Sequence, residues 1–191
     1  MTIFEHVSVF ISIILGLGVV HLLGGVSLIL DTRVRTRVYA VHLAWTFNML
    51  LLIVLAWLGN FVLAPITEFS ALHFFNLLAY FMVIYLMSGL LYPVRGEEVT
   101  DFKEHFHSNR PRFFTLGILF VTTDAVDGVL EARATGLDLN PFQFGQLAIF
   151  LALFVIGIRN ESEGFHRALV VLFFLGMLGF LYSLTQIGIV T

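Results

Sequence analysis

The stretch FFTLGILFVTTDAVDGVLEAR, Phe113–Arg133, is long and apolar enough to cross a membrane as a helix, yet it carries three carboxylates. Asp124, Asp127 and Glu131 are spaced i, i+3 and i+7, so a helix places them on one face within about 60°. At about 1.5 Å per residue from Phe113, Asp124 lies about 16 Å along the helix, near the middle of a hydrocarbon core about 30 Å thick. Inserting a carboxylate at that depth costs roughly 2.5–3.5 kcal/mol, so Asp124 is expected to face a partner, a cavity or an ion.

The composition of the whole chain points to the same environment. Of 191 residues, 59% are hydrophobic and 12% are charged, and the mean hydropathy is +0.96. Soluble domains carry about 25% charged residues, so an integral membrane protein is predicted. A net charge of -3 without a basic cluster argues against a nucleic-acid partner. The absence of cysteine excludes thiolate chemistry and leaves His and carboxylates as the strong metal ligands.

Hydropathy predicts an all-α fold, a compact bundle of six transmembrane helices in a single domain. The expected spans are residues 3–30, 38–60, 68–92, 113–133, 142–158 and 168–190. The long apolar run after residue 38 is divided at Pro65, and all four prolines are expected between spans. In the loop before the fourth span, Val99, Phe102 and Phe106 recur at i, i+3 and i+7, which predicts a short amphipathic helix on the inner surface.

The distribution of basic residues predicts the orientation. With both termini outside, nine of the ten Lys and Arg residues fall in inner loops, and Arg133 is the exception. These nine are Arg33, Arg35, Arg37, Arg95, Lys103, Arg110, Arg112, Arg159 and Arg167. The first apolar segment has no Lys or Arg before it, so it is expected to be a retained helix and not a signal peptide. We therefore expect a multi-pass protein of the cell membrane.

This orientation gathers polar residues of three spans in the outer half of the membrane. They are Asp124, Asp127 and Glu131 in the fourth span, Glu68, His73 and Asn76 at the third, and Glu5 and His6 at the first. We predict an acidic vestibule that binds protons or a cation, with Asp124 at its floor. Asp124, Asp127 and His73 would also suit zinc or manganese. The alternative is a structural network in which a neutral Asp124 bonds Thr122, Thr123 or a neighbouring helix.

A second group of histidines lies in the inner half. His21 and His42 match in depth, and Gly18, Gly24 and Gly25 leave bare backbone around His21, as an axial haem ligand requires. A b-type haem protein is therefore a second alternative, beside the simpler interpretation of a hydrogen-bonded histidine within a packed bundle. The inner-surface histidines His105, His107 and His166 are expected to be solvated, with a metal site shared with Asp101 or Glu104 as the alternative.

The segment DAVDGVLEAR, Asp124–Arg133, resembles the first half of the DxxDGxxAR signature of CDP-alcohol phosphotransferases. The resemblance would imply a six-helix enzyme of lipid synthesis whose aspartates hold a divalent metal. Here Ala132 and Arg133 come one residue late, and the second half of the signature, GxxxDxxxD, has no counterpart. The segment would also lie at the outer end of its helix, so the family is not assigned.

A stripe of mostly small residues, Ser8, Ser12, Gly16, Val20 and Gly24, recurs every four residues on the first span, and Gly176, Gly179 and Ser183 form another stripe on the sixth. Such stripes are expected to pack helices inside the bundle, with a dimer seam as the alternative. No nucleophile-elbow, zinc-protease or phosphate-loop motif is present, which favours a non-enzymatic function. Besides lipid, the expected partners are a second copy or a larger membrane complex in which the chain is a structural subunit.

Overall fold

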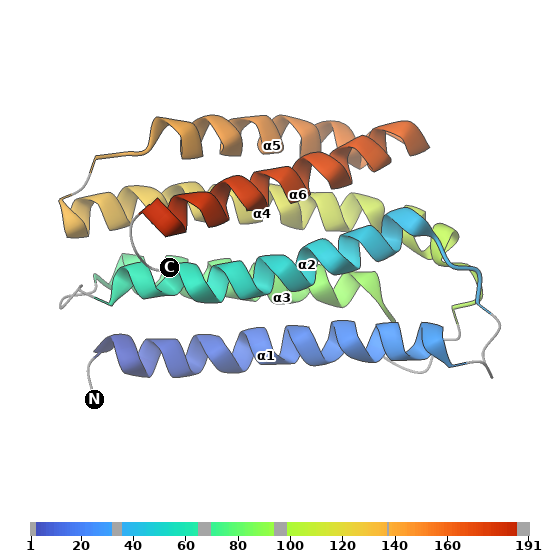
Figure 1. Cartoon of the computed structure of the whole chain (residues 1–191), viewed down its shortest axis with the longest axis horizontal. Coiled ribbons are helices and arrows are strands. Elements are labelled where there is room, and N and C mark those ends of the chain that lie inside the picture. Colours follow the sequence, from blue (N-terminus) through green and yellow to red (C-terminus); the bar gives the residue numbers. More distant parts are fainter. Residues whose placement is uncertain (1–2, 32–35, 65–69, 94–98, 137, 187–191) are drawn as a thin grey trace.

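The computed structural model describes residues 3–31, 36–64, 70–93, 99–136 and 138–186, and within them the chain is helical. The helices are α1 (Ile3–Leu30), α2 (Ala40–Gly59), α3 (Ala71–Leu91), α4 (Phe102–Thr135), α5 (Pro141–Arg159) and α6 (Glu163–Gln186). A short 3-10 helix, η1 (Asn60–Leu63), extends α2, and no β-strand occurs in the described ranges. Successive helices run in opposite directions along one long axis (Figure 1).

All six helices are long and apolar enough to cross a membrane, which confirms the predicted all-α class and the number of spans. Even the shortest, α5 with 19 residues, extends about 28 Å at 1.5 Å per residue. Large apolar side chains face outward, among them Val20, Phe142 and Tyr182, each at least 67% exposed. Such a surface suits lipid and not water, so the fold fits a multi-pass integral membrane protein.

Helix α4 differs from the prediction because it begins at Phe102, well before residue 113. The separate surface helix is therefore not confirmed, since Phe102 and Phe106 belong to the first turns of α4 itself. Pro111, expected between spans, lies inside this continuous helix. Asp101 begins the helix by accepting hydrogen bonds from the backbone N–H groups of Lys103, at 2.8 Å, and Glu104. Pro65 and Glu68 fall outside the described residues, as do Arg33, Arg35 and Arg95.

The helices form a layered bundle with α1 along one edge and α5 along the opposite edge (Figure 1). Between these edges α1 contacts α2 and α3, α3 contacts α4, α4 contacts α5, and α6 packs on α2 and α5. An aromatic core joins α2, α4, α5 and α6. Trp45 is fully buried at its centre, with ring centroids of Phe113 at 5.0 Å and Phe173 at 5.3 Å. Aromatic rings bury large areas, so this cluster stabilises the packing of the four helices.

The two stripes of small residues have different surroundings. On α6, a Cβ built on Gly176 would lie 2.8 Å from the Phe150 ring of α5, so this stripe packs inside the bundle as predicted. On α1, Ser12, Gly16 and Gly24 are exposed, and no described atom lies within 4 Å of a Cβ built on either glycine. The two serines of the stripe do contact the bundle, because Ser8 Oγ accepts from Asn60 Nδ2 at 2.9 Å and Ser12 Oγ from Trp57 Nε1 at 3.3 Å. Gly16 and Gly24 face outward, so the prediction that the stripe packs within the bundle is wrong for its glycines.

Candidate functional site

The three carboxylates of α4 line one cavity at the end of the bundle where α4 ends. The cavity measures about 1220 Å³ and lies between α2 with η1, α3, α4, the start of α5 and the end of α6. Asp124, Asp127 and Glu131 share it because their spacing sets them on one helix face. Asp138, in the turn before α5, adds a fourth carboxylate. None of the described residues that line the cavity is Lys, Arg or His, so its charge is negative wherever these groups are ionised.

Asp127 is held by two side chains of α3. Ser70 caps α3 by accepting from the backbone N–H of His73 at 3.1 Å, which places His73 in the first turn. The His73 side chain is buried, and its Nε2 lies 3.3 Å from Asp127 Oδ1. Asn76 Nδ2 donates to the Thr123 carbonyl at 3.0 Å and to Asp127 Oδ1 at 3.4 Å. The structure thus brings His73 and Asn76 together with Asp127, and their contacts fix its orientation.

Asp124 has a different environment from Asp127. Within the described ranges its carboxylate makes no hydrogen bond or ion pair. The two threonines expected to bond Asp124 in the structural alternative donate to backbone carbonyls of α4. Thr122 Oγ1 donates to the Ile118 carbonyl at 2.8 Å. Thr123 Oγ1 donates to the carbonyls of Leu119 and Phe120. The threonine network proposed for a structural Asp124 is therefore wrong. A half-buried carboxylate without protein partners inside an apolar bundle is costly, which leaves Asp124 available to a proton or a cation.

A smaller recess of about 100 Å³ adjoins the acidic cavity. Both have Asp124, Tyr80 and Gln143 in their walls, so Asp124 lies where they meet. Beyond this junction the recess is mostly apolar, and its lining includes Phe120, Phe150, Phe173, Leu147 and Met177. The site therefore has an acidic part and an apolar part, with Asp124 at the boundary.

The other predicted members of the vestibule are not in this cavity. Glu5 and His6 are exposed at the start of α1 and do not line it, because α3 lies between α1 and α4. Glu68 falls outside the described residues. The prediction overlooked Asn60, Asp138 and Asn140, which line the cavity. Asn140 caps the start of α5, because its Oδ1 accepts from the backbone N–H of Phe142 at 3.0 Å. An Asn followed by Pro141 is a helix-start signal in the sequence, and it indicates polar groups at this end of the bundle.

Metal and haem do not fit the residues proposed for them. No group of three or more His, Asp or Glu side chains is placed to hold a metal ion anywhere in the described ranges, so Asp124, Asp127 and His73 do not form such a site. At His21 and His42, the proposed haem ligands, there is no gap for a macrocycle. The Tyr92 ring fills the space beside His21, since a Cβ built on Gly25 would lie 2.1 Å from it. His42 Nε2 lies 2.6 Å from the Leu91 carbonyl, which occupies a nitrogen that an axial ligand would need.

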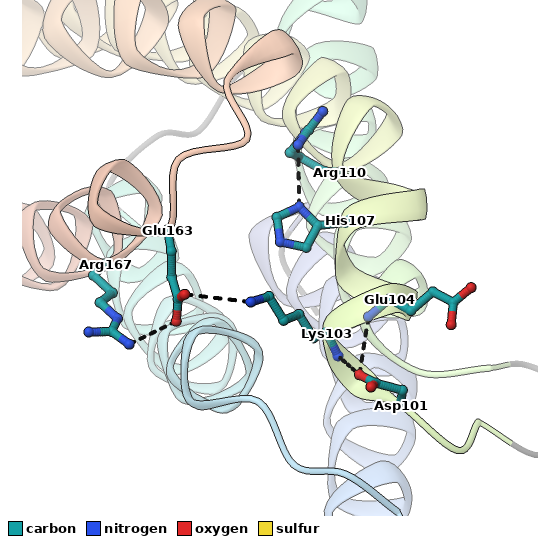
Figure 2. A network of polar contacts seen from close by, with 7 residues as sticks. All are labelled: Asp101, Lys103, Glu104, His107, Arg110, Glu163 and Arg167. Carbon is teal, nitrogen blue, oxygen red and sulfur yellow. Dashed lines mark hydrogen bonds and ion pairs between the residues drawn. The ribbon is translucent and has the colours of Figure 1, made fainter.

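The opposite end of the bundle carries a network of ion pairs that joins α4 to α6 (Figure 2). Lys103 and Arg167 both pair with Glu163, at 3.5 and 2.7 Å. Arg110, which is buried, donates to His107 Nδ1 at 3.3 Å. These contacts anchor the early turns of α4 that the hydropathy pattern assigned to a loop.

One of the histidines at this end contradicts its expected exposure. His166 is fully buried, with its ring stacked on Phe114 at 5.7 Å and its Nε2 2.7 Å from the Asn160 carbonyl. The prediction of a solvated His166 is therefore wrong. The i+3 and i+4 spacing of His166 to Leu169 and Val170, both buried, is the pattern that could have placed it on the inner face of α6.

Comparisons with protein-family models, with curated proteins and with solved structures find no match to this chain.

Proposed function

We propose that this chain is a membrane protein that handles protons or cations through the acidic cavity, with Asp124 as the binding or relay group. The observation that carries the proposal is the environment of Asp124. It lines a cavity whose described walls hold four carboxylates and no basic side chain, and no described side chain pairs with it. A cation or proton at Asp124 would remove the cost of a lone, half-buried carboxylate inside an apolar bundle.

The carboxylates of α4 would form an approach to Asp124 from the end of the bundle. Asp127 and Glu131 lie three and seven residues further along α4, so the three groups cover about 10 Å of the helix axis. In this proposal Glu131 and Asp127 attract the cation and Asp124 receives it. His73 and Asn76 act as positioning residues, because both contact Asp127 Oδ1 and neither lines the cavity.

Flux measurements on reconstituted protein test this function. Wild-type protein in lipid vesicles, driven by a potassium gradient, should conduct protons or small cations, with methylammonium tested beside the alkali ions, above the level of protein-free vesicles. Asp124→Asn keeps the shape of the side chain and removes its charge, so flux should fall to the protein-free level. Glu104→Gln removes an exposed carboxylate at the other end of α4 and should leave flux unchanged. Normal flux in Asp124→Asn would contradict the proposal.

The orientation is part of the proposal, with the cavity end of the bundle outside the cell. The Lys and Arg residues of the described ranges, except Arg133, belong to the turns and helix turns at the opposite end, where α2, α4 and α6 begin and α5 ends. This distribution follows the positive-inside rule.

Labelling of single-cysteine variants tests the orientation, because the chain has no cysteine of its own. Ala134 and Ser108 are exposed small residues at opposite ends of α4. An impermeant maleimide should label Ala134→Cys in intact cells and Ser108→Cys only after the membrane is opened. The reverse pattern would place the cavity on the cytoplasmic side.

A second candidate function is that of a structural subunit in a larger membrane complex. The outward-facing glycines of α1, Gly16 and Gly24, favour it, since exposed small residues allow close approach of another helix. Wild-type vesicles no more permeable than protein-free ones would favour this candidate over ion handling.

A further inference from the structure

We infer that the cation taken by this site is an organic ammonium that carries a small apolar group. The ammonium would pair with Asp124, and the apolar group would enter the adjoining recess. This inference rests on the proposed function, because it names the class of cation bound at the same carboxylate.

The size of the cavity argues against a desolvated inorganic ion. A protein site for such an ion brings several oxygen ligands within about 2.0–2.6 Å of one point. The acidic cavity measures about 1220 Å³, and no group of three or more His, Asp or Glu in the described residues is arranged for a metal. Pockets for small organic ligands measure about 300–1,000 Å³ and combine apolar walls with a few placed polar groups. The acidic cavity is somewhat larger than this range, and together with the recess it combines apolar walls with a few polar groups in the same way.

The recess has the size and the lining of a site for one apolar group. Its volume of about 100 Å³ is of the order of an engineered apolar cavity of about 150 Å³ that binds benzene. Phe120, Phe150 and Met177 contribute apolar walls. At the junction, Asp124 is accompanied by the rings of Tyr80 and Phe180, which line both spaces. An ammonium beside a carboxylate and aromatic faces gains both Coulomb and cation–π attraction.

Asn60 gives an independent indication that the acidic cavity receives a hydrogen-bond donor. Asn60 is among the residues that line this cavity, and it is 5% exposed. Asn60 Nδ2 donates to Ser8 Oγ at 2.9 Å, while no described group donates to its Oδ1. Buried acceptors are almost always satisfied, so an orphaned one requires an explanation. A ligand with a second N–H or O–H group would supply the missing donor.

Binding measurements with three simple probes test the inference on the purified wild-type protein. Benzylammonium has the charge and the apolar ring, methylammonium has only the charge, and benzyl alcohol has only the ring and a neutral polar group. By titration calorimetry in detergent micelles, benzylammonium should bind at least about tenfold more tightly than either of the others. Equal affinity for methylammonium would overturn the role of the recess, and equal affinity for benzyl alcohol would overturn the pairing with Asp124.

Variants on α6 and α4 locate the bound probe. A Cβ on Gly179 would lie 3.7 Å from the Phe142 ring, an ordinary contact, so Gly179→Ala should fold and keep binding. Gly179→Leu places a large side chain in the recess. Gly179→Leu and Asp124→Asn should each lower the affinity for benzylammonium about tenfold or more. If flux depends on Asp124 but benzylammonium does not bind, the inference fails and the proposed function stands. If Asp124→Asn leaves flux unchanged, the proposed function itself fails.

Discussion

Gly25→Ala should lower the free energy of unfolding by about 3 kcal/mol, because the added methyl has no room. A Cβ at Gly25 would lie 2.1 Å from Cγ of Tyr92 and within 2.4 Å of both neighbouring ring carbons. Cγ is the root of the ring, so the side chain cannot avoid the methyl by rotating about its last bond. Tyr92 is also fixed at its other end, where its hydroxyl lies 3.0 Å from Thr46 Oγ1, and its ring edge meets His42 at 4.8 Å.

Gly24→Ala is the matched control for this prediction. The two glycines are adjacent in the same helix, so both variants gain the same helix propensity, about 1 kcal/mol over glycine. At Gly24 no described atom lies within 4 Å of an added Cβ, so its variant should be as stable as wild type or more stable. Unfolding in dodecyl sulfate and detergent mixtures, followed by far-ultraviolet circular dichroism, measures both. Equal stability of the two variants would show that Tyr92 does not pack on Gly25.

The sequence predicts the helices well because hydropathy is a property of consecutive residues. The first span was expected at residues 3–30 and α1 occupies Ile3–Leu30. The start of α4 could not be found in the same way, because Pro111 and the charged residues around it resemble a loop. A proline inside a helix costs one backbone hydrogen bond, and packing of the early turns on α2 and α6 outweighs this cost. Only the Asp101 cap signals the true beginning.

The candidate site shows which relations a sequence carries and which it lacks. Spacing along one helix predicted that Asp124, Asp127 and Glu131 share a face, and all three line one cavity. Depth in the membrane was also used to group residues from different helices, but depth is one coordinate of three. Grouping by depth placed His73 near Asp127, and the two are in contact because α3 and α4 are neighbours. The same grouping placed Glu5 in the cavity, which is wrong because α1 does not pack on α4. The lateral order of helices comes from long-range packing, which periodicity does not encode.

The same limit applies to the glycines near His21. Gly18, Gly24 and Gly25 predicted a gap for a haem, but Gly24 faces open space, and the surface of Gly25 is covered by a side chain of this chain. The structure places Tyr92 of the α3 end there. A tyrosine ring and a haem edge both need a surface without side chains, so only the fold distinguishes the two.

Helices α4 and α5 pack through two reciprocal contacts, in which a glycine of each helix accepts a phenylalanine ring of the other. A Cβ on Gly117 would lie 2.8 Å from Phe154, and a Cβ on Gly157 would lie 3.0 Å from Phe114. Both rings are fully buried, and Trp45 covers them at 6.4 and 5.9 Å between centroids. The rings therefore have little space in which to move when a methyl is added.

Gly117→Ala should consequently destabilise the bundle by about 2 kcal/mol. A double-mutant cycle with Phe154→Leu, which shortens the opposing side chain, should recover about 1 kcal/mol of that loss, because the two positions contact each other. Gly145→Ala is the control on α5, since no described atom lies within 4 Å of a Cβ there, and it should not lower stability. The same dodecyl sulfate titration measures all the variants. Strict additivity of Gly117→Ala and Phe154→Leu would contradict the direct contact, because independent sites add and contacting ones do not.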